Sequence, residues 1–141
     1  MIIYLDTSAV VPLMVQEPSS ATCTEVWEKA NRVLGTRLVY VEATAALAMA
    51  VRTGRIDANS RLAAQDVLEQ LWQSIDVLEV DESLMKHAAW AAGHYDLRGY
   101  DAVHYAAAHS ARDDDLVAVS ADQRLIAAWM DSGLATLDTT P

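Results

Sequence analysis

The chain of 141 residues has little cysteine, little lysine and no long hydrophobic run. Its single cysteine, Cys23, excludes an intramolecular disulfide and a multi-cysteine zinc site, and its helical surroundings indicate a structural thiol. The longest uncharged stretch near the middle, Ala43 to Val51, falls well short of the ~18 apolar residues of a membrane span. The N-terminus lacks the basic segment of a signal peptide, and Asp6 interrupts its apolar run. We therefore expect a cytoplasmic protein that does not enter the membrane.

Positive charge is also scarce. Twenty acidic residues stand against ten basic ones, which gives a formal net charge of −10, and only Lys29 and Lys86 are lysines. Proteins that bind nucleic acid usually present a basic surface, because neutralising phosphates supplies much of their affinity. In an acidic chain that charge has to be offset locally, and bound divalent cations do this. The alternative is that the acidity only confers solubility.

Phenylalanine is absent, and aliphatic residues and alanine supply most of the 52% hydrophobic content. The length suits one domain, residues 1–141. Strand patterns alternate with helical patterns along the chain. We expect strands at 1–5, 32–35, 76–80, 116–119 and 134–138, and helices at 9–15, 21–32, 38–52, 56–75, 81–96, 101–110 and 120–130. This alternation predicts an α/β fold, a three-layer sandwich with a mostly parallel central sheet flanked by helices.

Two carboxylates follow predicted strands. Asp6 ends the first apolar run, and Asp122 lies three residues past Val119. Ligands of open α/β sheets bind outside the carboxyl ends of the strands, so both residues are candidates for a site. Each could instead cap or charge the start of a helix. Ser120 and Gln123 fit a capping box for the last helix, which would leave Asp122 free for another role.

Glu42 is the most informative acid. It is the only charged residue between Arg37 and Arg52, in a helix that is otherwise mostly apolar. A buried carboxylate without a partner costs several kcal/mol. Pairing with an arginine is the structural alternative, and coordination of a metal is the functional one. We favour the metal.

Asp101 opens a predicted helix and is the fourth candidate. An N-cap role is again the alternative. His104 follows one turn later and may reach the same region, but a lone histidine on an apolar helix is more often packed and hydrogen-bonded than a ligand. We expect His104 to be of the packed kind.

Together the four acids indicate a chemistry that none indicates alone. Hard oxygen ligands, with few histidines and no thiolates, suit Mg²⁺ or Mn²⁺. Two such ions about 3.5–4 Å apart stabilise the attacking and leaving oxygens of a phosphodiester displacement. Neighbouring carboxylates also repel one another, so in metal-free protein some should have a pKa well above the ordinary ~4.

These residues resemble the motifs of the PIN-domain family. The pattern comprises Leu-Asp6-Thr-Ser8 after the first strand, Val-Glu42 before an alanine-rich helix, Gly-Tyr-Asp101-Ala-Val-His, and Ser120-Ala-Asp122-Gln-Arg-Leu after a late strand. It spans Ile2 to about Leu125. Each motif is short, but all four occur in order at suitable spacing.

The resemblance implies a sandwich of helices around a parallel sheet, with Asp6, Glu42, Asp101 and Asp122 gathered around one or two Mg²⁺ ions, for which Mn²⁺ could substitute. It implies that Ser8 orders Asp6 and its water and that Ser120 stands where the family often has threonine. The chain departs from the pattern at Val41, because many relatives carry serine or threonine before the glutamate.

The size further resembles the VapC toxins of toxin–antitoxin pairs. That resemblance implies a Mg²⁺-dependent endoribonuclease whose water attack on phosphorus leaves a 5′-phosphate and a 3′-hydroxyl. The implied partners are an RNA substrate, a cognate antitoxin and a second copy in a homodimer, with DNA reached only through the antitoxin. The apolar helices near Met14 and Leu47 could supply the dimer surface. Candidates for gripping the RNA backbone, which could equally cap helix ends or face solvent, are Arg37, Arg52, Arg55 and Arg98.

Two other functions are considered. A metal-dependent phosphatase with an aspartyl nucleophile would carry a second aspartate two residues after Asp6, where this chain has Ser8, and a receiver domain would need a lysine after a late strand. A catalytically weak PIN-like scaffold that binds a protein partner is the non-enzymatic alternative. The presence of all four acids favours the enzyme.

Overall fold

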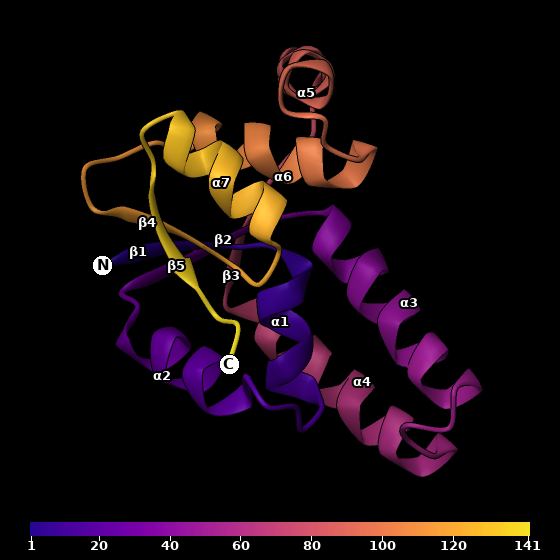
Figure 1. The fold of residues 1–141 in the computed structure, drawn as a ribbon. Coiled ribbons are helices and arrows are strands. Elements are labelled where there is room, and N and C mark those ends of the chain that lie inside the picture. Colours follow the sequence, from indigo (N-terminus) through magenta and orange to yellow (C-terminus); the bar gives the residue numbers. More distant parts are fainter.

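Five parallel strands form a single sheet at the centre of the computed structural model, which describes residues 1–141 (Figure 1). Their order across the sheet is β3-β2-β1-β4-β5. The strands are β1 (Ile2–Leu5), β2 (Arg32–Thr36), β3 (Ile75–Leu78), β4 (Leu116–Ser120) and β5 (Ala135–Asp138). Every neighbouring pair is parallel, and β5 lies at an edge. The predicted α/β fold is confirmed, with a sheet that is parallel throughout.

Seven helices connect and cover these strands. They are α1 (Thr7–Met14), α2 (Ser20–Lys29), α3 (Leu38–Arg52), α4 (Ala58–Gln73), α5 (Glu82–Tyr95), α6 (Gly99–Ser110) and α7 (Gln123–Asp131). In Figure 1, α6 and α7 lie on one side of the sheet, and α1 and α2 lie on the other. No helix is both long enough and apolar enough to cross a membrane.

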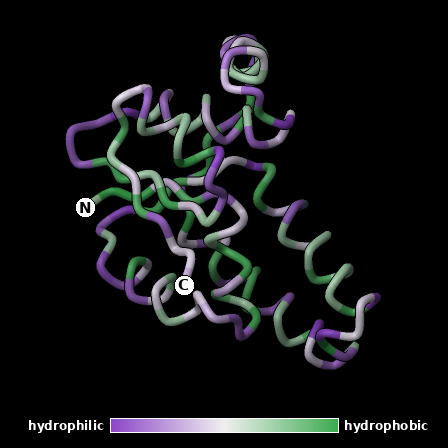
Figure 2. The backbone as a smooth tube through the Cα atoms, viewed as in Figure 1, coloured by the Kyte–Doolittle hydropathy of each residue, from purple (hydrophilic) through white to green (hydrophobic).

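Alternate residues of each strand face opposite sides of the sheet, and this alternation builds two cores. Tyr4 of β1 packs with α5, α6 and α7, whereas its neighbours Ile3 and Leu5 pack with α1, α2 and α3. The backbone is therefore most hydrophobic along the strands and most hydrophilic at the outer turns (Figure 2). Both faces of the sheet are covered, which is the predicted three-layer arrangement.

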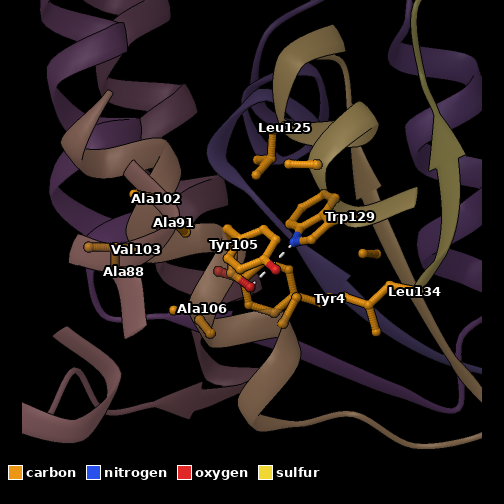
Figure 3. Packing of buried hydrophobic residues seen from close by; sticks show 14 of the residues in the cluster. Tyr4, Ala88, Ala91, Ala102, Val103, Tyr105, Ala106, Leu125, Trp129 and Leu134 are labelled. Atoms are coloured by element: carbon orange, nitrogen blue, oxygen red, sulfur yellow. Dashed lines mark hydrogen bonds between the residues drawn. The ribbon is translucent and has the colours of Figure 1, made fainter. Parts of the chain in front are cut away.

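The core on the α6 side packs small residues against a few large ones (Figure 3). The α5–α6 contact is rich in alanine, which allows the two helices to pack closely. Trp129 of α7 is fully buried, packs edge-on against Tyr4 at 5.9 Å between ring centroids, and donates its indole N–H to the carbonyl of Tyr105 at 3.4 Å. This packing fixes α6, which carries Asp101, against β1, which leads to Asp6.

Several element boundaries differ from those expected, and three of them show what decides a boundary. β3 begins at Ile75 rather than Asp76, because Ile75 pairs with Val33 of β2 and is buried. α6 begins at Gly99, inside the predicted loop 97–100. β4 continues through Ser120, and α7 begins only at Gln123, since Asp122 rather than Ser120 is its N-cap. Gly54 and Gly133 follow α3 and α7 with positive φ angles of 75° and 85°, a conformation that commonly ends a helix.

Candidate active site

The carboxyl ends of β1 and β4 meet at one edge of the sheet. The parallel register pairs Leu5 with Val119, and the Asp6 amide donates to the Val119 carbonyl at 3.3 Å. The next strand along the chain, β2, pairs with one side of β1, and β4 pairs with the other side of β1. This is a topological switch point, where open α/β sheets characteristically bind ligands.

Asp6 is a buried carboxylate with a side-chain partner. It occupies the N-cap position of α1, where its charge faces the start of the helix, but its side chain makes no capping hydrogen bond. Its Oδ1 atom instead accepts a hydrogen bond from the Ser8 hydroxyl at 2.7 Å, and only 4% of the residue is exposed. Burial raises the pKa of Asp6 to about 6, although nearby His104 and the Ser8 and Ser120 hydroxyls oppose this shift. A cation at this position would relieve the cost of the buried charge.

Two serine hydroxyls tie the ends of β1 and β4 together. The Ser8 Oγ atom accepts from the Ala121 amide at 2.8 Å and lies 3.3 Å from the Ser120 Oγ atom. Ser120 Oγ in turn accepts from the Asp122 amide at 2.9 Å. Ser8 thus lies beside Asp6 as expected. The predicted capping box of Ser120 and Gln123 is wrong, because Ser120 still belongs to the strand and its hydroxyl braces the turn that follows.

Asp122 caps α7, a role that was predicted for Ser120 and considered as the alternative for Asp122. Its Oδ1 atom accepts from the amides of Arg124 and Leu125 at 3.0 and 3.1 Å, which caps α7. Its Oδ2 atom lies 3.6 Å from the guanidinium of Arg98. Asp122 is therefore not wholly free, and its Oδ2 atom contacts Arg98.

Glu42 turns one oxygen toward two polar partners. Its Oε1 atom accepts from the Thr7 hydroxyl at 2.8 Å and bonds His104 Nε2 at 2.7 Å. The arginine pairing considered for Glu42 is therefore wrong, since its basic partner is a histidine. Thr7 supplies a hydroxyl beside the glutamate, whereas Val41, which precedes it, is exposed. Burial alone would raise the pKa of Glu42, but the hydrogen bond and charge of His104, together with Thr7, bring it below the ordinary value.

His104 is packed and hydrogen-bonded, as expected, but it also contacts the site. Only 1% of the residue is exposed, and its Nδ1 atom lies 2.6 Å from the Tyr4 hydroxyl. Burial lowers its pKa, but the hydrogen bond to Glu42 and the charges of Asp6, Glu42 and Asp101 outweigh burial, and the net shift is upward. Tyr4, Thr7 and His104 were not among the predicted site residues. The one available signal was the spacing of His104 one helical turn after Asp101.

Asp101 lies in the first turn of α6 and pairs with the residue that precedes the helix. The N-cap is Arg98, so the N-cap alternative for Asp101 is wrong. The Arg98 Nε atom donates to Asp101 Oδ2 at 2.9 Å, and the same guanidinium reaches Asp122. Because the Arg98 side chain is 81% exposed, solvent screens this bridge and it holds the two acids only weakly.

The four acids come from four elements but form two groups. Glu42 pairs with His104, and Arg98 joins Asp101 to Asp122. No three histidine, cysteine, aspartate or glutamate side chains converge closely enough to hold a metal ion in this arrangement. The donor set nevertheless has the chemistry of a Mg²⁺ or Mn²⁺ site, because Asp6, Glu42 and Asp101 each use only one carboxylate oxygen in hydrogen bonds. Joint ligation requires the weakly held Arg98 to leave.

The expected repulsion among the acids is seen only in part. The pKa of Asp6 is raised, but burial is the main cause and the charge of Asp122 is a minor one. The pKa of Glu42 moves in the opposite direction because His104 faces it. All four acids were predicted from the sequence. Their pairing with two basic groups, His104 and Arg98, was not predicted.

Two hollows flank Arg98 and Asp101. One of about 550 Å³ extends from Glu42 toward α5, and one of about 380 Å³ extends from Asp122 toward α7. The second is also lined by Arg124, an exposed base that was not among the candidates. Its only sequence signal is its place two residues after Asp122.

Of the four arginines considered for the RNA backbone, only Arg98 lines these hollows. Arg37 pairs with Glu79, and Arg55 pairs with Glu17. Leu47 is itself fully buried, but Val41 and Met49 of the same helix are exposed, so the dimer surface on α3 stays a prediction. Met14 is partly buried against the core on the α1 side.

Comparison with known proteins gives a consistent result. The family model described as PIN domain matches residues 3–128. Ribonuclease VapC49 of Mycobacterium tuberculosis (strain ATCC 25618 / H37Rv) is 34% identical over 124 residues, which cover 88% of this chain and 86% of that protein.

Among solved structures, Mycobacterium tuberculosis VapC20, a toxin that cleaves the sarcin-ricin loop, superposes with a TM-score of 0.70 at 20% identity, covering 96% of this chain and 98% of that one. VapBC2 of Rickettsia felis, bound to a DNA fragment from its promoter, superposes with a TM-score of 0.67 at 13% identity, covering 98% of each chain. At these identities the two structures show a shared fold.

Proposed function

Because this chain belongs to the PIN-domain family, we propose that it is a Mg²⁺-dependent endoribonuclease that acts as the toxin of a toxin–antitoxin pair. The observation that carries the proposal is that His104 feels the charges of Asp6, Glu42 and Asp101, while Arg98 links Asp101 to Asp122, beside the carboxyl ends of β1 and β4. The four acids come from four separate parts of the chain, and Asp6 is buried at an energetic cost that a bound cation would relieve. The ribonuclease name of the 34% identical relative supports the same reaction.

Mg²⁺, when bound by these carboxylates, supplies a Lewis acid for phosphodiester hydrolysis. The chain's own residues prepare the ligands for it. Ser8 fixes one oxygen of Asp6, while Thr7 and His104 fix one oxygen of Glu42, so each carboxylate offers its other oxygen in a set direction. Arg98 and Arg124 supply positive charge for RNA phosphates at the edge of an otherwise acidic protein.

The proposed hydrolysis adds water to the phosphorus and breaks its bond to the 3′-oxygen. The products therefore carry a 5′-phosphate and a 3′-hydroxyl. A proton must leave the attacking water, and a carboxylate of the cluster that is not committed to the metal would accept it.

A cognate antitoxin is the proposed protein partner. A structural neighbour is VapBC2 bound to a DNA fragment from its promoter, and we propose that this chain reaches DNA only through its antitoxin. We further propose that the toxin forms a homodimer.

The test is cleavage of total bacterial RNA by purified, antitoxin-free protein with Mg²⁺ or Mn²⁺, followed by mapping of the new ends. Discrete cuts with 5′-phosphates, lost in EDTA and in an Asp101→Asn variant, are the expected result. Absence of cuts by well-folded wild type in both metals contradicts the proposal.

That negative result would favour a scaffold that binds a partner without cutting RNA. One observation points toward this second candidate, because Arg98 holds two of the acids in an arrangement where no three ligands converge. Removing this bridge in Arg98→Gln separates the two cases. An enzyme gains or keeps metal binding in this variant, whereas a scaffold binds metal in neither form.

A further inference from the structure

The larger hollow beside the acids is apolar over most of its wall. It measures about 550 Å³, and Glu42, Arg98 and Asp101 lie at one part of it. The rest is formed by Gly99 and by apolar side chains from several elements, Leu38, Val80, Met85, Tyr100 and Val103. Neither metal binding nor phosphate contact requires apolar side chains. Its ligand should combine a charged group with an apolar one.

Tyr100 and Met85 present exposed apolar surface at this hollow. Tyr100 is 64% exposed and directly precedes Asp101, while Met85 of α5 is 49% exposed. Exposed aromatic rings serve as stacking platforms for unpaired bases in proteins that bind single-stranded nucleic acid. The position of Tyr100 next to an acid of the site would place a stacked base close to the phosphate.

We infer that this hollow receives an unpaired nucleobase of the RNA next to the phosphate that is cut, an inference that rests on the proposed function. Arg98 lines the same hollow and supplies the positive charge for the phosphate of that nucleotide. The volume lies within the usual range of small-ligand pockets, about 300–1,000 Å³, and exceeds the needs of a single base. One face of the base stacks on Tyr100, and Met85 and Val80 supply apolar surface around it.

The chemistry of the wall also defines what is recognised. Apolar side chains contact the face of a base and not its hydrogen-bonding edges, so the hollow tolerates any base identity. A base within a duplex cannot enter without being unpaired and unstacked.

The inference is tested by a cycle that pairs protein variants with altered RNA. The probe is a fluorescein-labelled RNA octamer of mixed sequence, compared with octamers in which one nucleotide at a time is abasic. Affinity is measured by polarisation in Ca²⁺, to limit cleavage, for wild type, Tyr100→Ala and Tyr100→Phe. Trp90→Ala is the matched control, because Trp90 is also a half-exposed aromatic, 51% exposed on α5, and does not line the hollow.

Tyr100→Ala should weaken binding of the intact octamer roughly tenfold, whereas Tyr100→Phe and Trp90→Ala keep it. At one position of the octamer the abasic change should cost wild type a similar factor and cost Tyr100→Ala nothing further. Equal affinities of Tyr100→Ala and wild type for the intact octamer would overturn the inference, and the hollow would then serve another ligand, such as a protein partner. If wild type cuts RNA but the variants and abasic octamers do not behave as expected, the proposed function stands and the base-binding inference fails. If wild type neither binds nor cuts RNA, both fail.

Discussion

The side chain that most sets the character of the site is Asp6. It is nearly inaccessible to solvent, and its hydrogen-bond partner is the single Ser8 hydroxyl. A carboxylate in this position destabilises the metal-free protein, because the charge is taken out of water with little compensation. Sites prepared for a cation commonly carry such a cost.

Asp6→Asn should therefore stabilise the metal-free protein at pH 7.5, by about 1–3 kcal/mol. Since burial raises the pKa of Asp6 from 3.8 to about 6, its folded form binds the proton more tightly than its unfolded form does. The stability due to the protonated acid is fully present below pH ~4 and is lost as pH rises through about 6. Asparagine resembles the protonated acid, so the difference between variant and wild type should grow between pH 4 and pH 7.

Thermal melts in EDTA across this pH range measure the difference. Asp66→Asn is the control, because Asp66 is exposed on α4 and should show no such growth. If the difference in stability between Asp6→Asn and wild type is the same at pH 4 and pH 7, Asp6 is not a buried acid with a raised pKa.

Among the elements, the start of α7 illustrates how one residue serves both fold and site. Asp122 caps the helix through Oδ1 and turns Oδ2 toward Arg98. An N-cap aspartate and asparagine are about equally good, whereas alanine lacks the acceptor. The two roles are thus separable by substitution.

Asp122→Ala should destabilise the protein by about 1 kcal/mol and also lower RNA cleavage, because it removes both the cap and the charge. Asp122→Asn should keep the melting temperature of wild type within about a degree yet still lower cleavage, since only the charge is lost. Thermal melts and cleavage rates on the same preparations give the comparison. If both variants cleave RNA as fast as wild type, Asp122 serves only to cap α7.

The limits of sequence reasoning appear at the same scale. Asp6, Glu42 and Asp101 could be singled out because each charge interrupts or borders an apolar pattern that implies burial. The exact start of α7 could not, since Ser120 and Asp122 are both good caps, and the pairing of β4 with β5 through Ser120 decides between them. The strand and helix order followed from periodicity, but boundaries depended on such tertiary contacts.

The contacts between elements were least accessible. His104 and Tyr4 are a hundred residues apart in sequence and hydrogen-bond only because α6 packs on β1. Likewise Thr7 meets Glu42 because α1 and α3 share one side of the sheet. No local pattern marks these long-range partners, so the acids were predicted without the groups that orient them.

Across the whole molecule, the net charge of −10 makes RNA binding depend on local cations. Arg98 and Arg124 are the bases that line the hollow beside Asp122, and Arg98 is engaged with two acids. A divalent ion that takes over these carboxylates neutralises the cluster and frees Arg98 for a phosphate. Metal binding and RNA binding are therefore coupled, because the ion that replaces Arg98 at the carboxylates makes the guanidinium available to the RNA. Both depend on the central claim that the four acids hold a metal.

That claim is tested most directly by calorimetric titration of Mn²⁺ into the protein without RNA. The account predicts saturable binding that is lost in Asp101→Asn and in Glu42→Gln, and that is retained or strengthened in Arg98→Gln, because the competing guanidinium is gone. Absence of binding to folded wild type, or binding that survives both acid substitutions unchanged, would contradict it.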